Sequence, residues 1–241
     1  MKSMHKAVNS FVVATSILAS GAAIAKIEAP FRSYVGMDVQ IRHMNFQKGY
    51  GQNLFKHDIT QGNVFFGVPL DENFRIEAGY EANPGKTRTN YLNVGDVSAG
   101  TTLGLAQQTI STSRIHGPHI SLSAVLPLKS NPNFKWVGSI GVAHLRMNLV
   151  RNTNFFVLPD GSLYYLSAHG LSPATTFLQT KNILKCSLGV EYDLSTDWGF
   201  RALIGWENTK KFSIPSVEAG TIGLINPRNS MLYSMGIFLK L

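Results

Sequence analysis

The end of the chain, residues 231–241, alternates strictly between apolar positions and positions of mixed polarity. One parity is apolar throughout and consists of Met231, Tyr233, Met235, Ile237, Leu239 and Leu241. Successive side chains of a β-strand point to opposite faces of the sheet. The pattern therefore predicts a long terminal strand with one wholly apolar face and one mixed face.

Seven earlier segments repeat this alternation, in the ranges 34–41, 60–70, 74–82, 119–128, 136–150, 184–194 and 198–207. The segment 136–150 departs from strict alternation, because its apolar parity changes between Val142 and Leu145. A β-bulge near Ala143 and His144 would restore a single apolar face. With the terminal segment, the pattern predicts eight antiparallel strands.

The connections between these segments alternate between short and long along the whole chain. Short ones lie at 69–73, 127–135 and 195–197, and long ones at 47–58, 83–117, 151–181 and 208–230. Outer-membrane barrels have short periplasmic turns and long extracellular loops, whereas a soluble sandwich gives no reason for the alternation. The predicted fold is thus all-β, an eight-stranded antiparallel up-and-down transmembrane β-barrel with both termini in the periplasm.

The N-terminus has the features of a secretory signal peptide. Lys2 and Lys6 precede a short apolar run at 11–19, and Ala23 and Ala25 form an A-x-A cleavage site. We expect cleavage between Ala25 and Lys26, so that residues 1–25 are the signal and 26–241 the barrel domain. The alternative, a membrane-anchoring or amphipathic first helix, is disfavoured because the apolar run is shorter than the roughly 20 residues that a spanning helix needs.

The polar parity of the predicted strands carries many charged residues. In a soluble sandwich they would face water, but in a narrow eight-stranded barrel they would point inward and need partners, because unpaired buried charge is costly. Glu191 and Arg201 fall opposite each other across the turn at 195–197, and we expect them to make contact. The predicted interior charges are Asp38, Arg42, Arg75, Glu77, Glu81, Arg146, Lys185, Glu191, Arg201, Glu207 and Lys240.

Charge is distributed unevenly between strands and loops. The full chain carries +8, and removal of Lys2 and Lys6 with the signal leaves +6. The four long connections hold ten basic and four acidic residues, which accounts for the whole excess. Basic loops suit anionic lipopolysaccharide head groups, although loops of any composition are solvated. Because the charges are dispersed on an exported chain, nucleic-acid binding is not expected.

These features together resemble the small eight-stranded bacterial outer-membrane barrels, the OmpA-barrel and Opa-like surface protein group. The resemblance rests on the signal, the eight strands, the loop alternation and the terminal strand. It implies localisation in the outer membrane, assembly by the barrel-assembly machinery, contact with outer-membrane lipids and lipopolysaccharide, and a host or environmental surface ligand. Members usually end in an aromatic residue, whereas this chain ends in Leu241, with Phe238 nearby. Peptidoglycan anchoring by a further domain is not expected.

Candidate chemistry is sparse. His119 and Ser121 share a strand face in an H-x-S pattern that resembles the pair of outer-membrane lipid A deacylases, with Glu81 or Asp96 as a candidate acidic partner; the simpler interpretation of His119 is a polar interior side chain. We predict no catalytic residue, cofactor or metal site. The remaining histidines, which lack metal-ligand spacing, are His43, His57, His116, His144 and His169.

Three functions remain open at this point. A surface protein would act structurally or contact ligands through its loops. There Phe155, Phe156, Tyr164 and Tyr165 form a contact patch, part of an aromatic girdle, or an extension of the barrel wall beyond the membrane. A small channel is the second hypothesis, and a lumen crowded with paired charges argues against it. A lipid A hydrolase using His119 and Ser121 is the third. The single cysteine, Cys186, allows no internal disulfide and is expected to be a small buried thiol.

Overall fold

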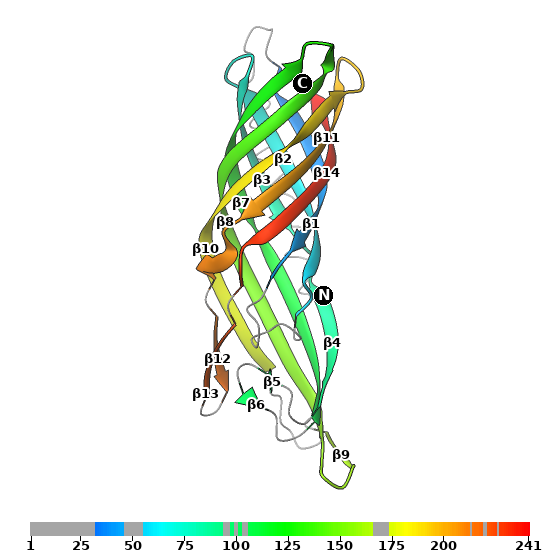
Figure 1. Ribbon diagram of the computed structural model, residues 1–241, viewed down its shortest axis with the longest axis vertical. Coiled ribbons are helices and arrows are strands. Elements are labelled where there is room, and N and C mark those ends of the chain that lie inside the picture. The colour runs from blue at the N-terminus through cyan, green and yellow to red at the C-terminus, as the bar shows by residue number, and fades with distance from the viewer. Residues whose placement is uncertain are drawn as a thin grey trace.

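The computed structural model describes residues 32–45, 55–93, 97–98, 101–102, 106–165, 174–212, 214–218, 221–225 and 227–241. The predicted signal peptide and its cleavage site at Ala25 and Lys26 lie outside these ranges. Eight long strands form the body of the molecule (Figure 1): β1 (Tyr34–His43), β2 (Asp58–Pro69), β3 (Phe74–Ala82), β7 (Ala106–Leu128), β8 (Asn131–Val157), β10 (Ala174–Asp193), β11 (Trp198–Glu207) and β14 (Ser230–Lys240).

These strands close into an antiparallel barrel. Each strand pairs with its neighbour along the chain in the order β1, β2, β3, β7, β8, β10, β11 and β14, and β14 pairs with β1 to close the ring. The three short turns and the C-terminal end lie together at one end, and the long connections lie at the other (Figure 1). The eight-stranded up-and-down barrel predicted from the alternation is confirmed.

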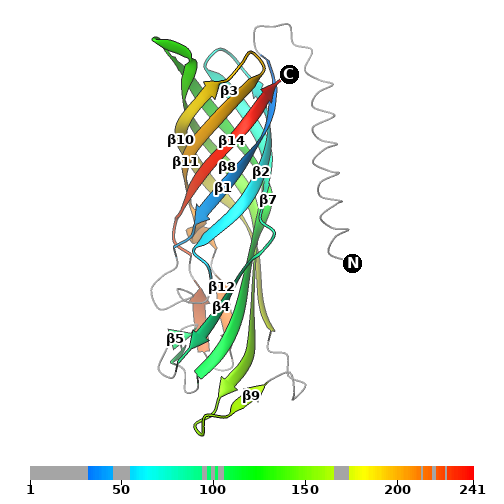
Figure 2. The ribbon, with the colours of Figure 1, turned by 90° about the vertical axis from the view of Figure 1, so that its right-hand side faces the viewer.

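Several small elements lie beyond the loop end of the barrel (Figure 2). β4 (Lys86–Leu92) pairs with β7, and β9 (Leu163–Tyr165) pairs with β8 to form a hairpin. Among the described residues no helix is both long and apolar enough to cross a membrane. The remaining elements are the two-stranded sheets of β5 (Val97–Ser98) with β6 (Thr101–Thr102) and β12 (Ile214–Glu218) with β13 (Thr221–Ile225), and the 3-10 turn η2 (Thr209–Lys211).

An apolar belt surrounds the outside of the barrel on the turn side. Leu188 and Val39 are more than 60% exposed, a state that is unfavourable in water and natural against lipid acyl chains. Trp198 and Trp206 lie eight residues apart on the outer face of β11. At about 3.4 Å per residue and a tilt near 40°, this spacing gives a belt roughly 20 Å tall, close to that of outer-membrane barrels. Other exposed members are Met37, Ile76, Ile120, Leu122, Trp136, Ile140, Ile204, Met235 and Ile237.

Beyond the belt, toward the long connections drawn at the bottom of Figure 1, the apolar side chains change from the outer to the inner face of the wall. Here 'above the belt' means toward this loop end. On β8, Ile140 and Val142 face outward, then His144 and Arg146 are exposed while Leu145 is fully buried. The register of β8 against β7 and β10 runs without a shift through this region, so the β-bulge predicted near Ala143 is wrong. The strand leaves the membrane there, and once the outside is water the apolar parity turns to the inside.

The inverted part encloses an apolar core, which we call the apolar plug. Most of its members come from the upper parts of the barrel strands, but Phe55 precedes β2 and Phe212 follows η2, and both are fully buried. The loops are thereby anchored in the mouth of the barrel. The plug consists of Met44, Phe55, Ile59, Ile115, Ala143, Leu145, Met147, Leu149, Phe177, Ile183 and Phe212.

Three aromatic rings fill the lumen at the turn end. The ring of Tyr34 packs edge-on against Phe65 and Phe238, with centroid distances of 6.1 and 5.6 Å. Glycines make room for them, because a Cβ at Gly67 would overlap the Tyr34 ring and one at Gly199 would overlap Phe238. Phe238 thus packs inside the barrel, and Leu241 ends the chain.

The only cysteine faces outward. Cys186 is exposed on β10 between Leu184 and Leu188, so the expectation of a buried thiol is wrong. The apolar parity of β10 is the lipid-facing one, and a small thiol suits that surface as well as a core.

A fluorophore attached to Cys186 should therefore lie among acyl chains. We expect acyl-chain-brominated lipids to quench its fluorescence strongly in reconstituted bilayers. The control is Cys186→Ser combined with Ser162→Cys, which moves the label to the exposed turn before β9 and should leave it unquenched. Equal quenching at both positions would contradict the assigned belt.

Candidate functional site

The lumen below the apolar plug is the most elaborate polar site of the described chain. Its charges are balanced, with six cationic and six anionic side chains. The cations are Arg42, Arg75, Lys135, Lys185, Arg201 and Lys240, and the anions are Asp38, Glu77, Glu81, Glu191, Asp193 and Glu207. These groups alternate with the lipid-facing residues and therefore face the lumen. Most of them are buried, whereas Lys135 and Lys240 near the turns keep 24% and 20% of their side-chain surface exposed.

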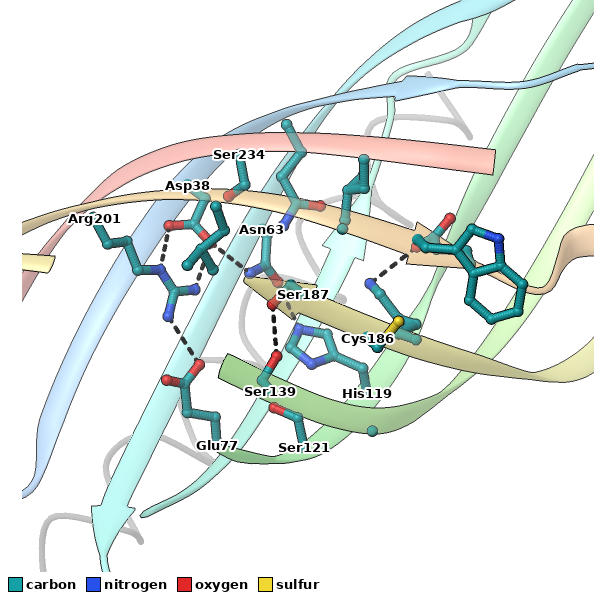
Figure 3. A pocket seen from close by; sticks show the side chains of 18 of the residues that line it. Asp38, Asn63, Glu77, His119, Ser121, Ser139, Cys186, Ser187, Arg201 and Ser234 are labelled. Carbon is teal, nitrogen blue, oxygen red and sulfur yellow. Dashed lines mark hydrogen bonds and ion pairs between the residues drawn. The ribbon is translucent and has the colours of Figure 1, made fainter. Parts of the chain in front are cut away.

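Arg201 is the centre of the middle layer. Its guanidinium donates to both oxygens of Asp38, at 2.8 and 2.5 Å, and to Glu77 at 2.8 Å (Figure 3). The same guanidinium lies over the ring of Phe65, with Cζ 3.5 Å from the centroid. Asn63 donates to Asp38 at 3.0 Å. Each charge in this layer therefore has an opposite charge and further hydrogen bonds, the condition under which buried ions are tolerated.

Arg75 forms the layer nearest the turns. It makes a two-pronged ion pair with Glu191 across the lumen and approaches Glu77 at 3.1 Å, while Tyr34 donates to Glu77 at 2.6 Å. The register places Glu191 opposite Arg201, as expected, but the charged groups do not pair with each other. Long side chains in a narrow lumen reach across it, so cross-strand neighbours are not the obligatory partners.

Arg42 forms the layer nearest the plug and has no exposed surface. It donates to Glu207 at 2.6 Å and to Glu81 at 2.7 Å. Lys185 bridges the same two carboxylates, at 3.2 Å from Glu207 and 2.6 Å from Glu81. Gln61 completes the layer by accepting from Arg42. Five strands, β1, β2, β3, β10 and β11, are tied together at this level.

One predicted interior charge lies outside the barrel. Arg146 is exposed on the outer face of β8, above the apolar belt, because the expected bulge is absent and the polarity inverts there. Lys240 lies in the lumen and pairs with Asp193 at 2.8 Å, and Lys135 reaches the same carboxylate at 2.7 Å. The parity of the predicted segment 184–194 already turns Asp193 inward, whereas Lys135 precedes the segment 136–150 and is found only by continuing its parity.

A cavity of about 60 Å³ lies beside Arg201 in the lumen (Figure 3), and Lys185 and Glu207 of the Arg42 layer also line it. It has room for a few water molecules. His119, Ser121, Ser139 and Ser187 line it. Ser139 and Ser187 bond to each other at 2.6 Å.

The geometry gives the hydrolase hypothesis no support. His119 and Ser121 both face the lumen, but His119 Nε2 lies 2.8 Å from Asn63 Oδ1 and is not hydrogen-bonded to Ser121. A serine nucleophile needs its base within hydrogen-bond reach. Glu81 is bound by Arg42 and Lys185, and Asp96 lies outside the described residues. The described part of the chain also contains no cluster of three or more ligating side chains that suits a metal ion.

Comparison with known proteins agrees with this architecture. No family model and no curated protein matches the chain. Among solved structures, Neisserial surface protein A is similar with a TM-score of 0.50 and 14% identity, over 87% of this chain and 97% of that one. Ail of Yersinia pestis (8% identity, 88% and 100% coverage) and OprG of Pseudomonas aeruginosa (14%, 87% and 96%) both match with a TM-score of 0.46.

At such identities the similarity shows the fold alone. The fold is that of the small eight-stranded outer-membrane barrels. The apolar belt outside and the paired charges inside are those of a barrel that spans a membrane.

Removal of Arg201 should destabilise the barrel strongly. Arg201→Met leaves Asp38 and Glu77 buried without their main partner, and we expect the free energy of unfolding to fall by about 3–5 kcal/mol. Urea unfolding of the refolded protein in lipid vesicles measures it. The exposed Lys56→Met should change stability by no more than about 0.5 kcal/mol.

A triple variant separates the effect of unpaired buried charge from the effect of the changed side-chain shape. Asp38→Asn and Glu77→Gln, added to Arg201→Met, remove the orphaned charges and should recover most of the loss. A single variant within 1 kcal/mol of the wild type, or a triple variant as unstable as the single one, would show that the pairing does not hold the lumen together.

Proposed function

We propose that the protein is a surface protein of the bacterial outer membrane that contacts ligands through an extracellular extension of its wall. One observation carries the proposal: three adjacent strands, β7, β8 and β10, run 23, 27 and 20 residues and continue far above the apolar belt. From Ala143 to Val157, β8 adds roughly 45 Å of strand at about 3.4 Å per residue. A barrel that only stabilised the envelope would not need such a projection.

The tip of the projection presents apolar and aromatic side chains. In the β8–β9 hairpin, Leu163 and Tyr165 are each 48% exposed, and Tyr91 on β4 is 70% exposed. Asp160 closes the hairpin turn by accepting hydrogen bonds from the hydroxyl and backbone of Ser162, which lowers the pKa of its carboxyl. Exposed aromatic side chains are typical of contact surfaces, which favours the contact-patch interpretation of Tyr165 over the girdle.

The channel hypothesis fits the lumen poorly. Three ion-paired layers and the aromatic cluster of Tyr34, Phe65 and Phe238 cross it in the membrane, and the apolar plug closes the mouth. An ion would have to break several charge-assisted bonds and then cross a dry apolar region. We infer that the lumen is a structural core and that function lies outside it.

The partners follow from this role. We propose that the barrel-assembly machinery inserts the chain, that lipids and lipopolysaccharide surround its belt, and that a host or environmental surface ligand binds its projection. No nucleic acid is expected as a partner.

Whole-cell labelling tests the orientation. In the Cys186→Ser background, Ser162→Cys should react with a membrane-impermeant maleimide on intact cells, because the hairpin tip is extracellular. Ser195→Cys, in the opposite turn, should react only after lysis. Labelling of Ser195→Cys but not Ser162→Cys on intact cells would reverse the orientation, and recovery of the protein in a soluble fraction would end the proposal.

Planar-bilayer recording tests the closed lumen. We expect the folded protein, verified by heat-modifiable migration on a gel, to show no steady unit currents under conditions in which an open porin conducts. Reproducible unit currents from the wild type would favour the channel instead.

A further inference from the structure

Four basic side chains lie together on the outer wall just above the apolar belt. Arg114 and His116 lie on β7, and His144 and Arg146 lie on the adjacent strand β8. Arg114, His144 and Arg146 are exposed, and His116 is half-buried. We call this group the basic cluster. The proposed channel, enzyme and loop-contact functions leave it unused.

The strand register makes the four residues neighbours on the outer face, and the Arg114 side chain lies against the position of Gly85, ahead of β4. His116 lies directly opposite Arg146, and Arg114 lies opposite Asn148, one step along the same outer face. Directly opposed cross-strand side chains have Cβ atoms about 4.5–5.5 Å apart, and diagonal neighbours are about 7–8 Å apart. Both histidine rings are held in place, because Nδ1 of His116 lies 2.8 Å from the Tyr80 hydroxyl and Nδ1 of His144 lies 2.7 Å from Asn182 Oδ1.

The cluster has no acidic counterpart on its own wall. Residues 106–118 of β7, 143–157 of β8 and 174–183 of β10 contain no aspartate or glutamate. Within the described ranges, the guanidinium of Arg146 has no hydrogen-bond or ion-pair partner. The two arginines are the permanent charges of the group, and like charges that are neighbours on a sheet repel each other. An anion from outside the chain would therefore stabilise this part of the wall.

The height of the cluster on the wall identifies the anion. Val142 on β8 and Ile120 on β7, both exposed to acyl chains, lie immediately below His144 and Pro118 on the same outer faces. A lipid packed on these side chains carries its head group at the level of Arg146. The anionic groups at that level of the outer leaflet are the phosphates of lipid A, and arginine binds phosphate with paired hydrogen bonds.

We propose that the basic cluster is a binding site for a lipid A phosphate, with Arg146 and Arg114 as the charged ligands and His116 and His144 as flanking donors. The site rests on the proposed outer-membrane location. It would hold one glycolipid against β7 and β8 and fix how deeply the long wall sits in the outer leaflet.

Native mass spectrometry of the purified protein, freed of copurifying lipid, tests the site. The two probes are diphosphoryl lipid A and the same lipid A with both phosphates removed. The wild type should retain the diphosphoryl form at least ten times more tightly. Arg114→Gln with Arg146→Gln should lower its affinity about tenfold, to that of the dephosphorylated lipid, and leave the latter unchanged. Lys56→Gln, an exposed cation ahead of β2, should behave as the wild type.

Two results would overturn the proposal: equal retention of both lipids by the wild type, or equal losses in the Lys56→Gln control and the double variant. All variants change exposed side chains, and heat-modifiable migration verifies that each is folded. Because the assay uses isolated protein, a failure here leaves the whole-cell labelling intact. A failure of that labelling would instead remove the outer leaflet as the setting of the site.

Discussion

The structure depends on the mutual neutralisation of charges that are buried in the lumen. Arg42, Arg201 and Arg75 each bind two carboxylates, and most of these carboxylates bind a second cation. An ion without a partner at this depth would cost several kcal/mol. Loss of one charged residue therefore also destabilises the partners that it leaves buried. The outer belt can be uniformly apolar because the polar residues of the same strands are satisfied inside.

The wall changes its chemistry where it leaves the membrane. Within the belt, Ile140 faces lipid and Ser139 faces the lumen; a few residues later Arg146 faces water and Leu145 faces the plug. No irregularity of the backbone accompanies this change. One set of three strands therefore serves as membrane wall and then as the wall of a soluble-type barrel, with solvent alone deciding which parity is apolar.

The alternation in the sequence was enough to predict the eight strands, their order and the inward direction of residues such as Arg201 and Glu207. It was not enough for the segment 136–150. The prediction assumed that the apolar face of a strand always points outward, and it therefore required a bulge at the place where the strand passes from lipid into water. The same assumption misplaced Arg146 and shortened β7, β8 and β10. Partner choice also escaped prediction, since Glu191 reaches Arg75 across the lumen and no spacing along one hairpin encodes that distance.

The apolar plug lies between the ion-paired layers of the lumen and the loop end of the barrel. Phe55 and Phe212 are buried in the plug and attach the chain before β2 and after η2 to the loop end of the barrel. The tip of the β8–β9 hairpin lies at the opposite end of the molecule from the short turns (Figure 1), and we expect substitutions there to leave the ion-paired layers intact. Such a scaffold allows the sequence at the far end of the wall to vary while the fold stays the same.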